Sequence, residues 1–306
     1  MLRRTFLSAL GAGAGLAVIA TAGPALADGP DVQYPPTIDL PPGVQPDSIV
    51  MLGRAPHAAV SSRHDGAIYR VDLQHGDVTQ VRAGRPGRQA RGLAVGRYGP
   101  LFVAGGAGRH MIEVLDSETG ELLASYPRFH HRSDVNDVVA GTAAAWFIDG
   151  INPELYRLEL GHDEPLPSAA TRVRITGELR YRPGINANGL TSTPDGSAFL
   201  VVQAVTGNLY RVTDQGVSTQ VDLGGEKVFG GDGLHLKDGT LYVAQPRHAQ
   251  VTKIEIDAAG TAGQVVSRNR DPRFVAPAGI TEHHNIFYVT NGRRPGPGSI
   301  ESVGIR

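Results

Sequence analysis

Residues 188–212 read NGLTSTPDGSAFLVVQAVTGNLYRV, and they contain a pattern that recurs along the chain. A polar residue and a glycine open the stretch, an apolar strand follows, and Pro194-Asp195-Gly196 marks a turn. A second apolar strand comes next, then a further turn with glycine, and then a third strand, Leu209-Tyr210-Arg211-Val212. Short β-rich runs separated by such turn residues are typical of consecutive antiparallel hairpins.

The same kind of opening occurs six times. The six openings are Asp47-Ser48-Ile49, Arg91-Gly92-Leu93, Asn136-Asp137-Val138, Asn188-Gly189-Leu190, Asp232-Gly233-Leu234 and Ala278-Gly279-Ile280. Their first residues are 44, 45, 52, 44 and 46 positions apart. A period of about 45 residues with several short strands per period is typical of a propeller blade. We therefore predict an all-β fold, a six-bladed β-propeller whose four-stranded antiparallel blades surround a central tunnel.

The ends of the repeat series carry two further predictions. The sixth repeat runs out of sequence after Ser299–Ile305, so we expect a strand near Thr37–Leu40 to complete its blade and close the ring. The longest step, 52 residues, predicts an inserted surface loop around His162–Ser168. A seven-bladed ring or an open β-solenoid is the competing architecture.

The first 27 residues have the features of an export signal. Arg3-Arg4-Thr5-Phe6-Leu7 precedes a Gly- and Ala-rich apolar run from Ala9 to Ala22, and Ala25-Leu26-Ala27 follows. This predicts a twin-arginine signal peptide, residues 1–27, and one propeller domain over residues 28–306. A membrane anchor is the alternative, but the run is shorter than the roughly 20 residues that span a bilayer. We expect the protein to be exported by the twin-arginine route and to be secreted, periplasmic or held at the cell envelope.

Composition excludes several kinds of site. The chain has no cysteine, so disulfides, thiolate zinc sites and cysteine nucleophiles are excluded. Its formal net charge of −1 argues against a nucleic-acid partner, because phosphate binding needs a basic excess. We expect a monomer with no membrane span after signal removal, which binds a small-molecule ligand or substrate at the tunnel mouth.

The first residues of the six openings are expected to form a ring. In a propeller the innermost strand of each blade lines the tunnel, so these residues gather at one rim; they are Asp47, Arg91, Asn136, Asn188, Asp232 and Ala278. Four of them are Asp or Asn, whose oxygens hard cations prefer. We predict that Asp47, Asn136, Asn188 and Asp232 hold a divalent cation, Ca²⁺ by its ligand preference. The alternative is that Asn and Asp before Gly begin strands because they tolerate turn geometry.

These stretches also resemble the SMP-30/gluconolactonase-like propellers, with strictosidine-synthase-like proteins and paraoxonases as more distant relatives. The resemblance runs from about Pro46 to Asn291, and its best stretches are Val135-Asn136-Asp137-Val138, Asn186-Ala187-Asn188-Gly189-Leu190 and Gly231-Asp232-Gly233-Leu234. It implies a cation held by an acidic residue of the first blade, an Asn of the fourth and an Asp of the fifth. By position these are Asp47, Asn188 and Asp232, and Asn136 would face the substrate.

Two positions depart from that family. Asp47 stands where its members usually have Glu, and is shorter by one methylene. Asp134 stands where sugar lactonases tend to have Arg, which argues against a sugar-lactone substrate.

The chemistry that these residues favour is metal-assisted hydrolysis of a small ester or lactone. We predict Asp232 as ligand and base, with Asn136 as the second catalytic residue, beside a polarised carbonyl. The predicted substrate rim consists of Arg91, Asp149, Gln203, Gln245, Asn291 and His131. Loops after the second strands also bring Arg63, Arg247 and His248 to this rim. Two alternatives stay open: a non-catalytic propeller that binds a ligand or a protein at its rim, and a non-hydrolytic lyase or cyclase.

Overall fold

The computed structural model describes residues 34–97, 99–107, 110–127, 129–161, 165–292 and 296–305. The predicted signal peptide lies outside these residues, as do residues 162–164 of the predicted insertion. In the part of the chain that is described, no helix is long and apolar enough to cross a membrane.

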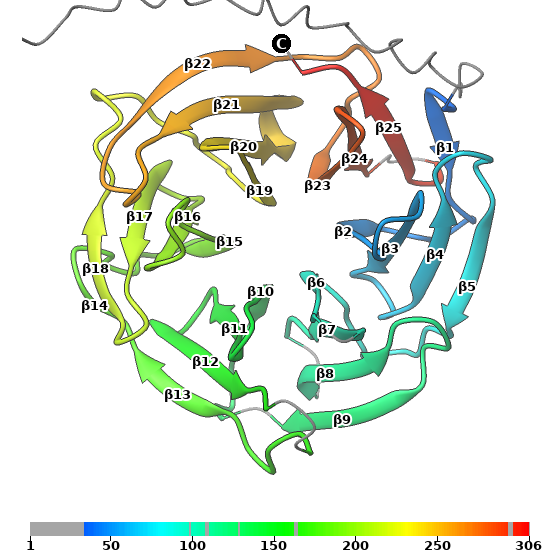
Figure 1. Cartoon of the computed structure of the whole chain (residues 1–306), viewed down its shortest axis with the longest axis horizontal. Coiled ribbons are helices and arrows are strands. Elements are labelled where there is room, and N and C mark those ends of the chain that lie inside the picture. Colours follow the sequence, from blue (N-terminus) through cyan, green and yellow to red (C-terminus); the bar gives the residue numbers. More distant parts are fainter. Residues whose placement is uncertain are drawn as a thin grey trace, which may run out of the picture. The chain divides into compact units, whose positions relative to one another are not determined.

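Six sheets follow one another in a ring (Figure 1), and their inner strands line a central cavity, the tunnel, of about 240 Å³. Blades one to three comprise β2 (Pro46–Met51), β3 (His57–Ser62), β4 (Ile68–Asp72) and β5 (Val78–Arg82); β6 (Leu93–Val95), β7 (Pro100–Ala104), β8 (His110–Asp116) and β9 (Leu122–Pro127); and β10 (Val135–Ala140), β11 (Ala144–Asp149), β12 (Glu154–Glu159) and β13 (Thr171–Arg174). Blades four to six comprise β15 (Ala187–Ser192), β16 (Phe199–Gln203), β17 (Asn208–Val212) and β18 (Val217–Gln220); β19 (Leu234–Lys237), β20 (Thr240–Gln245), β21 (Gln250–Ile256) and β22 (Gly263–Asn269); and β23 (Pro277–His283), β24 (Ile286–Asn291), β25 (Ser299–Val303) and β1 (Thr37–Asp39). The chain is a six-bladed β-propeller.

The sixth blade is completed from the other end of the described chain, as predicted. β1 pairs antiparallel with β25, with Ile38 opposite Ile300. Ile38 is 3% exposed and Ile300 is fully buried, so the closing strand also brings an apolar side chain into the core. Because the first and last strands share one sheet, the ring is closed by hydrogen bonds rather than by an added covalent link.

Blade four departs from the predicted four strands. A short strand, β14 (Thr176–Gly177), runs parallel to β18 and gives this blade a fifth strand at its outer edge. The Ser218 hydroxyl donates a hydrogen bond to the Thr176 carbonyl oxygen. Part of the extra length of the third repeat step is therefore used as an edge strand, which the repeat pattern alone does not predict. A short 3₁₀ turn, η1 (Pro246–His248), follows β20.

The core lies between the blades. Six apolar clusters of described residues fill the gaps between neighbouring blades. In the gap between blades two and three, the rings of Phe102 and Phe147 meet edge to face with centroids 6.4 Å apart. In the gap between blades five and six, the ring centroids of Tyr242 and Phe287 lie 4.3 Å apart. Each blade thus buries the face that it would expose alone, which is why the repeats are stable only as a closed ring.

The inner strands are irregular where the ring residues sit. The register shifts between Pro46 and Ile49, and equivalent shifts occur at the start of β10, β15 and β23. A β-bulge re-aims a side chain and bends its strand. In the propeller, these bulges include four of the six opening residues, Asp47, Asn136, Asn188 and Ala278.

Glycine after the ring residue lets neighbouring inner strands come close. A Cβ atom at Gly189 would lie 2.0 Å from the carbonyl oxygen of Asp232, and one at Gly279 would lie 2.6 Å from that of Asp47. Both distances are shorter than any real contact, so these positions accept only glycine. This close approach brings ring residues of adjacent blades within contact distance.

Candidate functional site

Two of the predicted ring residues, Asn188 and Asp232, are in direct contact, and a third, Asn136, reaches the next blade. Asn188 Nδ2 donates hydrogen bonds to Asp232 Oδ1 at 2.8 Å and to the Gly231 carbonyl oxygen at 3.1 Å. Asn136 Nδ2 donates to the Ala187 carbonyl oxygen at 3.1 Å. The amides of blades three and four therefore both reach across to the next blade, as expected if the six inner strands start in register.

Two arginines lie beside the first-blade carboxylate. Arg63 Nη1 is 3.6 Å from Asp47 Oδ1, and Arg91 Nη1 is 3.9 Å from Asp47 Oδ2. Arg91 also approaches Asp134, with Nη2 3.4 Å from Oδ2. Arg91 is therefore part of the ring, held between carboxylates of blades one and three, and it gives the ring a fixed positive charge.

Some polar atoms of the ring lack hydrogen bonds. Among the described residues, neither Asp47 Oδ1 nor Asn136 Oδ1 has a hydrogen-bond partner, although both atoms are buried. A buried polar atom left unpaired costs about 1–3 kcal/mol, so such atoms call for a ligand, an ion or water. Two oxygens of the predicted cation site thus have unused acceptor capacity.

The carboxylates of the ring are held in an environment that disfavours their charge. Burial raises the pKa of Asp232, and the nearby Asp47 carboxylate raises it further, against the lowering effect of Arg91. Burial also raises the pKa of Asp47, opposed by Arg91 and Arg63. Burial acts to lower the pKa of Arg91, but Asp47, Asp134 and Asp232 together raise it above its usual value. The two arginines therefore offset only part of the negative charge.

The donor set fits a hard cation. Asp47 and Asp232 offer carboxylate oxygens, and Asn136 and Asn188 offer amide oxygens because their Nδ2 atoms are already used as donors. Oxygen ligands of this kind suit Ca²⁺, whereas zinc prefers imidazole and thiolate. Within the described residues, no three His, Cys, Asp or Glu side chains are grouped so that they could hold a metal. A cation here would depend on the two amides and on backbone or water oxygens.

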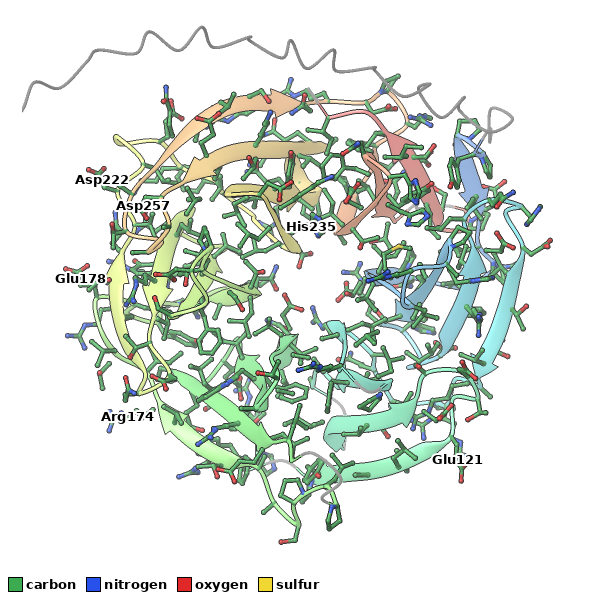
Figure 2. All side chains as sticks on the ribbon, in the orientation of Figure 1. Glu121, Arg174, Glu178, Asp222, His235 and Asp257 are labelled. Atoms are coloured by element: carbon green, nitrogen blue, oxygen red, sulfur yellow. The ribbon has the colours of Figure 1, made fainter. Side chains whose placement is uncertain are left out.

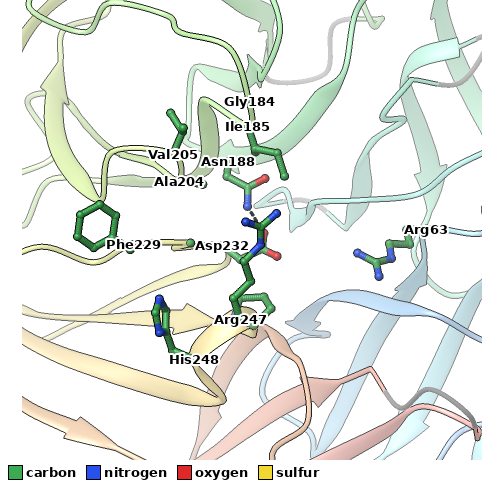
Figure 3. A pocket seen from close by; sticks show the side chains of 12 residues that line it. Arg63, Gly184, Ile185, Asn188, Ala204, Val205, Phe229, Asp232, Arg247 and His248 are labelled. Atoms are coloured by element: carbon green, nitrogen blue, oxygen red, sulfur yellow. Dashed lines mark hydrogen bonds between the residues drawn. The ribbon is translucent and has the colours of Figure 1, made fainter.

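A cavity of about 650 Å³ opens beside the ring. Its lining residues, which define what we name the mouth cavity, are Arg63, Gly184, Ile185, Asn188, Ala204, Val205, Phe229, Gly230, Asp232, Pro246, Arg247 and His248. Figure 3 shows Asn188 and Asp232 at its centre, Arg63 on the opposite side, and Phe229 and Val205 at one edge. The cavity is of the size that small-molecule sites have.

Four predicted rim residues have a different position. Asp149, Gln203, Gln245 and Asn291 each end the second strand of a blade, and each is at most 2% exposed. They do not line the mouth cavity. Their side chains bind the loop that precedes the first strand of the same blade. For example, Gln245 Nε2 donates to the Phe229 carbonyl oxygen at 2.7 Å, and Asn291 Oδ1 accepts from the Val275 amide at 2.8 Å.

The remaining two predicted rim residues, Arg91 and His131, differ in position. Arg91 lies in the ring, and its side chain is 21% exposed. His131 lies on an exposed loop before β10, and the structure does not bring it to the mouth cavity. Arg63, Arg247 and His248, which the loops after the second strands were expected to supply, do line the cavity.

Two groups of residues were missed. The apolar cavity residues Ile185 and Phe229 each stand three positions before a ring residue, so their loops had to lie on the same rim. Asp137 was also missed: its Oδ2 accepts a hydrogen bond from the Leu190 amide at 2.8 Å, between blades three and four. Burial raises the pKa of Asp137 to about 7. The signal was its position, since glycine stands there in four of the six openings.

Comparison with known proteins places the chain by its fold. No family model and no curated protein matches the sequence. Virginiamycin B lyase from Staphylococcus aureus is similar in structure, with a TM-score of 0.60 and 15% identity over 86% of this chain and 83% of the lyase. The allergen Mala s 1 of Malassezia sympodialis has a TM-score of 0.64 and 12% identity over 88% of this chain and 96% of the allergen.

A luciferin-regenerating enzyme is also similar, with a TM-score of 0.63 and 13% identity over 88% of this chain and 95% of that enzyme. These neighbours are propellers of the SMP-30/LRE-like and virginiamycin B lyase types. The resemblance that the sequence predicts is therefore confirmed at the level of the fold. At such low identities, the likeness carries no residue roles.

Proposed function

We propose that this propeller is a hydrolase that cleaves a small ester or lactone at the tunnel mouth with the help of a bound divalent cation, Ca²⁺ by its ligand preference. One observation carries the proposal. Asn188 and Asp232, which are hydrogen-bonded to each other in the ring, are also walls of the mouth cavity. A substrate in the cavity would therefore contact the same side chains that would hold the cation.

The cation would be held by Asp47, Asn188 and Asp232, with Asn136 beside them. When bound, it would supply Lewis-acid chemistry, which polarises a carbonyl and lowers the pKa of water. The chain's own groups supply the rest. Asn188 fixes Asp232 through one carboxylate oxygen. The other oxygen of Asp232 accepts the proton of the attacking water. Asn136 presents an amide oxygen without a hydrogen-bond partner among the described residues, and this atom would accept a substrate hydroxyl.

The neighbours support an enzymatic role but not a choice of reaction. Two of them are named as enzymes, a lyase and a luciferin-regenerating enzyme. Hydrolysis and elimination can be separated by isotope labelling. In water enriched in ¹⁸O, a hydrolase puts the label into its product, whereas a lyase releases an unsaturated product without it.

The test is turnover of an ester and lactone panel by the purified protein, in calcium and in excess chelator. We expect turnover only with the cation, and a loss of about 100-fold or more for Asp232→Asn. Asp214→Asn is the matched control, because Asp214 lies in an exposed turn and changes charge in the same way. No turnover of the whole panel would favour a non-catalytic binding propeller. Turnover unchanged in chelator would remove the cation from the proposal.

We also propose that the protein reaches its place of action by the twin-arginine route. The support is the Arg3-Arg4 pair and the apolar run that follows it. Protein recovered from outside the cytoplasm should begin at Asp28 on N-terminal sequencing. Retention of residues 1–27 in the exported protein would contradict the predicted cleavage.

A further inference from the structure

The mouth cavity is lined by two kinds of side chain. Its apolar residues, which we name the apolar side, are Ile185, Val205 and Phe229, and they are 49%, 39% and 49% exposed. Its polar residues, which we name the polar side, are Arg63, Asn188, Asp232, Arg247 and His248. Single apolar residues on a surface need no explanation, but three that converge on one cavity are typical of a binding site.

The apolar side is a fixed wall. The Val205 amide donates to the Ile185 carbonyl oxygen at 2.9 Å, which joins two of its loops. Gln245 holds the Phe229 carbonyl oxygen at 2.7 Å, so the loop that carries the aromatic ring is tied to blade five. Because the backbone is held in this way, the wall presents its apolar groups without a folding step on binding, and a ligand does not lose affinity to loop ordering.

The polar side carries two arginines. Arg247 lies in η1, and Ala249, which follows η1, has φ 48° and ψ 49°, a left-handed conformation that is unfavourable for a non-glycine residue. Strain of this kind is kept where a loop has a defined task. Arg63 and Arg247 both line the cavity, and Figure 3 shows the Arg63 side chain apart from the other labelled side chains.

The two arginines have guanidinium capacity to spare. No ion pair links Arg247 to an acidic side chain of the described residues, and Arg63 approaches Asp47 only to 3.6 Å. Guanidinium groups bind carboxylates in a paired, planar geometry. Asp47 and Asp232 lie close by and would repel a second negative charge, so the cavity fits a monoanion better than a dianion.

We propose that the mouth cavity binds an amphipathic carboxylate, whose aryl or branched alkyl group packs on Phe229, Val205 and Ile185 and whose carboxylate pairs with Arg247. As a statement about the substrate, this rests on the proposed function: the scissile ester or lactone carbonyl lies between these two groups, beside Asn188 and Asp232. As a statement about binding, it stands on the cavity alone.

The experiment measures binding by calorimetry to the purified protein. The probes are 4-phenylbutyrate, its neutral amide 4-phenylbutanamide, and acetate, which lacks the apolar group. We expect 4-phenylbutyrate to bind about tenfold or more tightly than the amide, and acetate to give no measurable binding. Equal affinity for the carboxylate and the amide, or failure of both to bind, would overturn the proposal.

Substitutions separate the two sides. Arg247→Gln should weaken 4-phenylbutyrate about tenfold and leave the amide unchanged. Phe229→Ala should weaken both probes by about tenfold. Arg54→Gln and Val266→Ala are the matched controls, because both residues are exposed and outside the cavity. Since Arg247 and Phe229 are exposed as well, melting temperatures should stay unchanged, and a loss of binding then reports the contact.

Failure of the carboxylate-binding proposal can be distinguished from failure of the proposed hydrolase function. If no ester or lactone is cleaved but the carboxylate still binds with the expected dependence on Arg247, hydrolysis is wrong and the binding proposal holds. Cation-dependent hydrolysis of neutral esters alone, with kcat/KM unchanged in Arg247→Gln, has the opposite meaning. Hydrolysis then holds, and the carboxylate-binding proposal is wrong.

Discussion

Asn188 donates a hydrogen bond to Asp232 at 2.8 Å across the gap between two blades, and these residues are 44 positions apart in the chain. That separation equals one repeat step. The contact therefore joins the same position of two successive repeats. Asn188 also holds the Gly231 carbonyl oxygen at 3.1 Å, so one amide fixes both the side chain and the backbone of the fifth-blade opening.

Replacing this amide should loosen the ring. Asn188→Ala leaves the Gly231 carbonyl and one Asp232 oxygen without their donor, and we expect the free energy of unfolding to fall by about 1–3 kcal/mol. Denaturant unfolding in chelator measures this loss without a contribution from the cation. An unchanged free energy of unfolding would mean that water replaces the amide at no cost, and that Asn188 does not position Asp232.

Close approach of the inner strands can be tested at Gly189. Alanine there would place its Cβ 2.0 Å from the Asp232 carbonyl oxygen, so the two blades must move apart. We expect Gly189→Ala to destabilise the protein by about 1–3 kcal/mol or more. Gly304→Ala is the control, because a Cβ atom there meets nothing within 4 Å. Equal melting temperatures for the two variants would contradict the tight ring.

The closing strand gives a prediction about the whole ring. Ile38 of β1 is 3% exposed and packs in the cluster between blades six and one. Ile38→Ala should lower the free energy of unfolding by about 2–4 kcal/mol, the usual cost of such a deletion in a core. Thr79→Ala on the exposed outer strand β5 should have little effect. If the two substitutions cost the same, β1 does not close the ring.

His235 should make stability depend on pH. It lies near the inner edge of blade five (Figure 2), with its ring centroid 6.3 Å from that of Tyr242 and 6.1 Å from that of Phe287. Burial lowers its pKa to about 4; Glu282 acts to raise this pKa and Lys237 to lower it. Because the folded pKa lies below that of the unfolded chain, which is about 6.5, the unfolded chain binds the proton first as pH falls.

Stability linked to His235 is therefore complete above about pH 6.5 and is lost as the pH falls toward 4, with a loss of roughly 2 kcal/mol between pH 7 and pH 5. Urea unfolding at pH 7 and pH 5, in chelator, measures the loss. His235→Phe keeps an aromatic ring but cannot titrate, so its loss between these pH values should be smaller than that of the natural chain. The same loss in both proteins would show that folding does not lower the pKa of His235.

The architecture was predictable because the same sequence pattern repeats in every blade. Six openings at a nearly constant step indicated six blades, and the missing outer strand of the last blade indicated that residues near Thr37 would close it. Convergence of Asn188 and Asp232 followed from the same register. These features depend on backbone pairing, which the periodic pattern of apolar and turn residues specifies.

The details of the site depend on where side chains point. Gln203 and Gln245 end strands beside the mouth cavity and look like ligand-binding residues in the sequence, yet they turn inward because loop backbone needs their hydrogen bonds. The apolar wall was only partly predictable: the position of Phe229 three residues before Asp232 places its loop at this rim, but nothing in the sequence shows that its side chain is exposed. Neither orientation follows from residue type or spacing.

The proposed divalent cation of the ring would have Asp232 as a ligand. The most direct measurement is the melting temperature of the natural chain and of Asp232→Asn across a calcium titration, starting from excess chelator. A cation bound only by the folded state raises the melting temperature as its free concentration rises. We predict this rise for the natural chain and for Asp214→Asn, and a strongly reduced rise for Asp232→Asn. The same melting temperature in calcium and in chelator for the natural chain would contradict the claim.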